Sequence, residues 1–125
     1  MPGLASQLEA AFQRRSKAFK QWGDLSIESD ADGVFVRVRH HPWPTTDLHV
    51  QDSGKFILVV RGGTKKNRRV YLELSNERLA PNAPAICKAF EETSRSAMDF
   101  GRQDDDGVAD EIRKRWASMT ISVAD

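Results

Sequence analysis

The sequence predicts a single α+β domain, residues 1–125, in which an N-terminal helix and two C-terminal helices accompany an antiparallel sheet of four to five strands. Three observations predict it. Both ends of the chain show helical spacing of apolar residues, the middle alternates in the period of a strand, and the strands follow one another without an intervening helix. With 125 residues, 39% of them hydrophobic, the chain is long enough to bury one core.

The first element is a predicted amphipathic helix over residues 4–22. Its apolar residues fall near one face at helical spacing, and its basic and amide residues fall elsewhere. The apolar residues are Leu4, Leu8, Ala11, Phe12, Phe19 and Trp22. Gly23 is suited to end the helix, and Lys20 in the last turn interacts favourably with the helix dipole.

The predicted sheet covers residues 25–74. Val34, Val36 and Val38 alternate with polar or aromatic neighbours, which is the pattern of a strand with one buried face. Residues 56–60 are apolar at every position, so we expect a central strand that is buried on both faces. A pair of glycines then opens a long hairpin loop that leads into the last predicted strand.

Two helices are predicted after the sheet, over residues 84–100 and 106–119. Asn82 is a candidate N-cap for the first helix. The acidic run 104–106 is suited to capping the second helix and to stabilising its dipole. Because amphipathic helices need an apolar partner, we expect the first two helices of the chain to cover the valine row of the sheet.

Charge is balanced over the whole chain but concentrated in one segment. The formal net charge is only +1, so any binding of a polyanion has to depend on a local patch. The densest patch is residues 61–69, with five basic residues and no acidic residue: Arg61, Lys65, Lys66, Arg68 and Arg69. Such a cluster is suited to phosphate oxygens. The alternative is a solvated hairpin tip that is kept basic to prevent edge pairing.

Strand alternation adds a second candidate surface. If the valines face the core, one outward surface carries Phe35, Arg37, Arg39, Arg69 and Tyr71. Aromatic side chains between arginines can stack nucleic acid bases or anchor a protein partner. The alternative, which we favour, is that the last helix covers this face with Trp116 and makes Phe35 part of the core.

Three histidines and one carboxylate are clustered before the basic segment. His40, His41, His49 and Asp47 are residue types that can hold a divalent metal or act in base catalysis. Adjacent residues on an extended chain point in opposite directions, so at most one of His40 and His41 can join His49. Because no nucleophile motif accompanies them, we expect exposed histidines with no metal, no cofactor and no catalytic residue.

The remaining features narrow the class of protein. Cys87 is the single cysteine, which excludes an internal disulfide, and we expect a semi-buried, inert thiol. No apolar run reaches the ~18 residues of a membrane span. The N-terminus also lacks the pattern of a secretory signal. We therefore expect a cytoplasmic protein without a membrane partner.

These observations favour a non-enzymatic binding module that docks its basic hairpin onto nucleic acid or a nucleoprotein assembly. In this hypothesis Arg37, Arg39 and Tyr71 extend the contact made by residues 61–69. The alternative is a protein–protein adaptor or inhibitor, such as a phage or mobile-element regulator, that binds an acidic protein surface. A more distant alternative is a metal-dependent hydrolase built on His49, Asp47 and one further histidine. The oligomeric state stays open.

Overall fold

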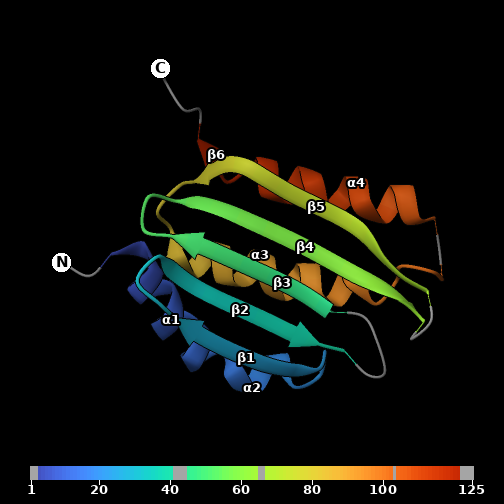
Figure 1. The fold of residues 1–125 in the computed structure, drawn as a ribbon, viewed down its shortest axis with the longest axis horizontal. Helices are drawn as coiled ribbons and strands as arrows, with labels where there is room; N and C mark the ends of the chain where they lie inside the picture. Colours follow the sequence, from blue (N-terminus) through green and yellow to red (C-terminus); the bar gives the residue numbers. More distant parts are fainter. Residues whose placement is uncertain (1–2, 41–44, 65–66, 103, 122–125) are drawn as a thin grey trace.

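The structure is a computed structural model that describes residues 3–40, 45–64, 67–102 and 104–121. Its elements, in chain order, are α1 (Leu4–Arg14), α2 (Ser16–Phe19), β1 (Asp24–Ser29), β2 (Gly33–Arg39), β3 (Thr45–Gln51), β4 (Lys55–Thr64), β5 (Asn67–Leu79), α3 (Ala83–Ala97), α4 (Asp105–Ala117) and β6 (Thr120–Ile121). The predicted α+β class is confirmed. Figure 1 shows one curved sheet with the helices behind it.

The described strands form one antiparallel meander in the order β1 to β6, so each strand pairs with its neighbour in the sequence. The prediction of four to five strands was too low. The last strand is only Thr120–Ile121, which pairs with Arg78 and Leu79 at the end of β5. Two residues are too few to show an alternating pattern, and β5 continues five residues beyond the expected end of the sheet.

The core lies between the sheet and the helices. Val34, Val36 and Val38 are fully buried, as the alternation of this strand predicted. Phe12 lies edge-on to Phe90, with the ring centroids 5.5 Å apart. Because α1 packs against α3 and against β1 and β2, these aromatic rings join both helices to the valine row.

The N-terminal helix is shorter than the predicted residues 4–22. It ends at Arg14, and the short helix α2 follows after Arg15. The backbone N–H of Arg15 is shared between the carbonyl oxygens of Ala11 and Phe12, which is the tightened last turn of a helix end. After this bend Phe19 is fully buried, and Trp22 lies beyond the helix and is only partly buried.

The two C-terminal helices lie within a few residues of the predicted ranges, at Ala83–Ala97 and Asp105–Ala117. The predicted cap is confirmed, because the side chain of Asn82 accepts a hydrogen bond from the backbone N–H of Ala85 at 3.2 Å. Asp104 occupies the N-cap position of α4 but makes no capping bond with its side chain. The other acidic residues of the run lie in the first turn, where they favour the helix dipole.

Helix α4 does not cover the outer face of the sheet, so that expectation was wrong. Its Trp116 is fully buried on the inner side, stacked on Phe56 with centroids 5.5 Å apart. The Trp116 indole N–H also donates to Thr93 Oγ1 on α3 at 2.8 Å. In Figure 1, α4 lies beside α3 along β5, and none of the four described helices lies over the opposite face of the sheet.

Candidate functional site

The uncovered face of the sheet places three rows of side chains next to one another. The strand register aligns Phe35 with His49 and Ile57, then Arg37 with Asp47 and Val59, and then Arg39 with Thr45 and Arg61. Side chains at alternate positions of a strand share a face, and the valines between them are buried on the other side. We call the surface made by these nine residues the open face. The predicted outward positions of Phe35, Arg37 and Arg39 are confirmed.

The open face is hollowed. A cavity of about 500 Å³ is lined by Glu28, Asp30, Phe35, Arg37, Asp47, His49, Ile57, Val59 and Arg61. The lining runs from two carboxylates on β1 and the following turn to two guanidinium groups on β2 and β4. The hollow therefore has an acidic end, an apolar middle and a basic end.

The basic end is organised around Asp47, whose side chain is only 6% exposed. Arg37 donates from Nε and Nη2 to the two carboxylate oxygens of Asp47, at 2.8 and 3.0 Å. Arg61 donates from Nη1 to Asp47 Oδ2 at 2.6 Å. The hydrogen bonds that Arg37 donates to the Asp47 carboxylate raise the pKa of Arg37 above its ordinary value. One buried carboxylate therefore holds two guanidinium groups in fixed positions, with one positive charge in excess.

Apolar side chains are exposed beside this cluster. Ile57 is 45% exposed in the row of Phe35, and Val70, which pairs with Arg61 on the neighbouring strand, is 51% exposed. The Arg37 guanidinium lies over the Phe35 ring, 5.3 Å from its centroid. Exposed branched side chains therefore lie next to the two arginines that Asp47 holds in place.

The open face does not include Arg69 or Tyr71, so this part of the prediction was wrong. The register of β4 and β5 shifts between Val60 and Arg61, which is a β-bulge. At the bulge Tyr71 packs on the helix side, stacked on Phe100 with centroids 4.6 Å apart. Arg69 follows it, and its Nη2 lies 2.8 Å from Asp105 Oδ2 on α4. An extra residue breaks the strict alternation on which the expectation depended.

The basic segment 61–69 is therefore divided between two sides of the sheet. Arg61 is paired with Asp47 on the open face, and Arg69 is paired with Asp105 on the helix side. Lys65, Lys66 and the side chain of Arg68 lie outside the described part of the molecule. The two arginines that are described each have a carboxylate partner, which reduces their attraction for phosphate.

The expectation of exposed histidines was wrong for His40. That residue is 1% exposed, with Nδ1 2.6 Å from the Trp22 carbonyl oxygen and Nε2 3.0 Å from Thr46 Oγ1. Burial lowers the pKa of His40. His49 lies on the open face, and His41 lies outside the described residues. Among the residues that the structure describes, no group of three or more His, Cys, Asp or Glu side chains is arranged to hold a metal ion.

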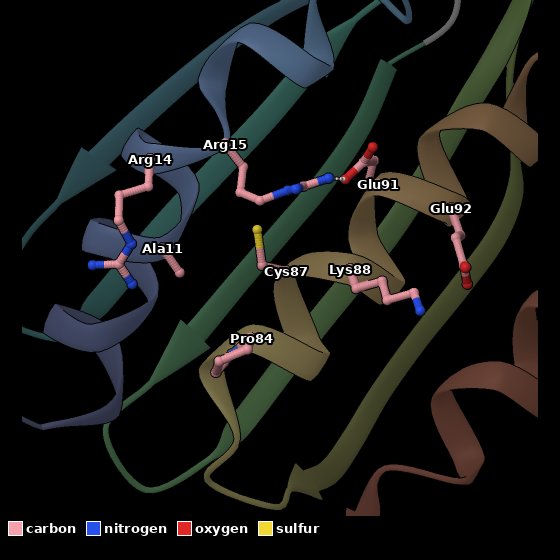
Figure 2. Close-up of a pocket in the computed structure, with 8 residues that line it drawn as sticks. All are labelled: Ala11, Arg14, Arg15, Pro84, Cys87, Lys88, Glu91 and Glu92. Carbon is pink, nitrogen blue, oxygen red and sulfur yellow. Dashed lines mark hydrogen bonds and ion pairs between the residues drawn. The ribbon is translucent and has the colours of Figure 1, made fainter.

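A second hollow, of about 550 Å³, lies between α1 and α3 (Figure 2). An ion pair of 2.7 Å between Arg15 and Glu91 crosses it, and the Cys87 sulfur points into it beneath Arg15. Burial raises the pKa of the Cys87 thiol to about 11, so the thiol is protonated at neutral pH. This agrees with the expectation of an inert cysteine.

Comparisons of the chain with protein-family models, with curated proteins and with solved structures find no match. No helix in the described part of the chain is long and apolar enough to cross a membrane.

Proposed function

We propose that the protein is a non-enzymatic binding module that docks a protein partner on the open face. The observation that carries this proposal is an uncovered, hollowed sheet face on which Ile57 is 45% exposed next to the Arg37–Asp47–Arg61 cluster. Protein interfaces combine an apolar centre with a polar rim, and arginine is common among their energetically important residues. The open face has this composition.

The charges of the open face favour protein over nucleic acid. A phosphate backbone needs cations without carboxylates beside them, since affinity comes from neutralising phosphates and releasing counterions. Here Asp47 lies between Arg37 and Arg61, and Glu28 and Asp30 line the same hollow. These carboxylates repel a polyanion but are compatible with a protein surface of mixed charge.

The aromatic residue of the open face also favours a protein partner. Stacking of bases requires an accessible ring face. The Arg37 guanidinium already lies over the Phe35 ring, and the His49 ring lies on the neighbouring strand with its centroid 6.4 Å from that of Phe35. The ring is better placed to contact an aliphatic side chain at its edge than to receive a base.

The test compares two isoleucines of similar exposure. Ile57 on the open face is 45% exposed, and Ile121 on β6 is 47% exposed. Tagged protein carrying Ile57→Asp or Ile121→Asp is used to capture partners from an extract of the source cell after nuclease treatment. We expect a stoichiometric protein partner that is retained by wild type and by Ile121→Asp and is lost from Ile57→Asp.

Other results would contradict the docking of a protein partner on the open face. If the captured material disappears after nuclease treatment, or if a labelled oligonucleotide binds at low salt and loses affinity steeply at moderate salt, the nucleic acid hypothesis is supported instead. Charge reversal at Lys65, Lys66, Arg68 and Arg69 then tests whether the hairpin makes that contact. Retention of the same partner by Ile57→Asp removes the open face from the proposal.

A further inference from the structure

The bonds within the Arg37–Asp47–Arg61 cluster use only some of its hydrogen-bond donors. A guanidinium group has five N–H donors. Arg37 uses its Nε and Nη2 atoms, and Arg61 uses Nη1, for bonds to Asp47. Arg37 is 36% exposed and Arg61 is 49% exposed at the side chain, so both guanidinium groups are accessible to a ligand. Donors of this kind bind a carboxylate with charge-assisted hydrogen bonds.

The two guanidinium groups are also held in place before any ligand arrives. Asp47 is buried and bonds both of them, which restricts side chains that otherwise lose rotamer freedom on binding. Asp47 cancels only one of the two positive charges. The cluster is therefore a preorganised site for one further negative charge.

The other residues that line the hollow indicate which side chains of a ligand would accompany its negative charge. Phe35, Val59 and Ile57 form an apolar middle beside the arginines. Glu28 and Asp30 line the other end, and Asp30 Oδ1 already accepts the backbone N–H groups of Asp32 and Gly33. A second negative charge at that end would be repelled, whereas a positive charge would be attracted.

We propose that the open face recognises an extended segment of a protein partner that presents an acidic, an apolar and a basic side chain at alternate positions. Alternate residues of an extended segment point the same way at intervals of about 7 Å. The acidic group binds Arg37 and Arg61, and the apolar group packs on the neighbouring row of Phe35, His49 and Ile57. The basic group approaches Glu28, which pairs with Phe35 at the β1 end of that row. This inference depends on the proposed function, because it names the chemistry of the partner that docks there.

The test uses a defined peptide. The probe is an acetylated and amidated heptapeptide in which glutamate, leucine and lysine alternate with threonine, and the control peptide has glutamine in place of glutamate. Each is titrated into isotopically labelled protein while the side-chain Nε–H signals of Arg37 and Arg61 and the δ-methyl signal of Ile57 are followed. We expect saturable shifts of all three signals, and about tenfold weaker binding of the glutamine peptide.

A matched pair of variants assigns the effect to the cluster. Arg61→Gln removes guanidinium donors from the open face, and Arg113→Gln changes an arginine of similar exposure that is paired with Asp110 on α4. We expect Arg61→Gln to abolish the preference for glutamate over glutamine, and Arg113→Gln to leave it unchanged. Arg37 still pairs with the buried Asp47 in Arg61→Gln, and Arg113 is exposed, so neither change is expected to unfold the protein.

Three outcomes overturn the inference. Equal affinity of wild type for the two peptides shows that no carboxylate is recognised. Displacement of the peptide by oligothymidylate at a lower concentration assigns the face to nucleic acid. Finally, capture of a protein partner that depends on Ile57, together with equal binding of the two peptides, keeps the binding module and rejects the acidic segment as its ligand.

Discussion

The guanidinium carbon of Arg69 lies 4.4 Å from the centroid of the Tyr71 ring, on the helix side of β5. The other face of that ring stacks on Phe100 at the end of α3, and Arg69 is paired with Asp105 at the start of α4. Asp105 also accepts the backbone N–H of Gly101, whose φ of +81° is readily adopted only by glycine. These contacts join the start of β5, next to the hairpin loop, to the connection between α3 and α4.

Tyr71→Leu is predicted to lower the free energy of unfolding. The change keeps an apolar side chain at the position but removes the ring stacked on Phe100 and the cation–π contact with Arg69, so we expect a loss of about 1–2 kcal/mol. Urea denaturation followed by tryptophan fluorescence measures it. Tyr71→Phe keeps the ring and is the control, and an equal loss in both variants would assign the effect to the hydroxyl instead of the stack.

Thr93→Val is predicted to destabilise the packing of α4 on α3. Thr93 Oγ1 accepts the indole N–H of Trp116, and both residues are fully buried. Valine has nearly the same shape but no acceptor, so the indole N–H is left unpaired at a cost of about 1–3 kcal/mol. Trp116→Phe removes the donor, and a variant with both substitutions, Thr93→Val and Trp116→Phe, completes a double-mutant cycle. If the two losses simply add, the hydrogen bond is not the cause.

His40 is predicted to make stability depend on pH. Burial lowers the pKa of His40 in the folded protein below its ordinary value of 6.5. As pH falls below that value, the unfolded chain takes up a proton first, so the free energy of unfolding decreases until the folded pKa is reached. Denaturant midpoints measured between about pH 7.5 and pH 5 give the slope of the free energy of unfolding against pH.

The control for this prediction is another histidine of the sheet. His40→Gln should flatten the pH dependence in the acidic range, whatever its effect on stability at neutral pH. His49→Gln changes a side chain on the open face and is the matched histidine variant for comparison. A slope that persists in His40→Gln would assign the pH dependence to other groups.

Cys87 is predicted to react slowly with thiol reagents in the native protein. Its thiol pKa of about 11 leaves little thiolate at neutral pH, and the side chain is buried under the Arg15–Glu91 ion pair. The rate of labelling by a disulfide reagent should rise about tenfold per pH unit up to the pKa and should be far higher in denaturant. Fast labelling of folded protein at neutral pH would contradict the protonated, buried thiol.

The order and type of the main elements followed from local patterns. The valine row of β2 and the cap at Asn82 were predicted because a strand period and an N-cap are encoded by adjacent residues. The ends of the N-terminal helix were not predicted correctly, because the bend at Arg15 depends on where Phe19 packs in the folded protein. Helix periodicity indicates that one face is buried but not against which element it lies.

The pairing at the open face needed information that a single sequence does not contain. Alternation predicted that Arg37 points outward, but only the register shows that Asp47 lies opposite it and that Arg61 reaches the same carboxylate. An acidic residue in a strand next to outward arginines was the available signal, but Asp47 was considered only as a possible partner of the histidines. The bulge that moves Tyr71 to the helix side had no sequence signal of its own.

The meander described above also determines how the chain can fold. Strands β1 to β5 are joined by successive hairpins that each close a short loop, whereas β6 pairs with β5 only after α3 and α4. The contacts between α1 and α3 are different, since they join segments separated by all of β1 to β5. Docking of these two helices carries the largest loop-closure entropy, so a refolding experiment should find their contacts among the last to form.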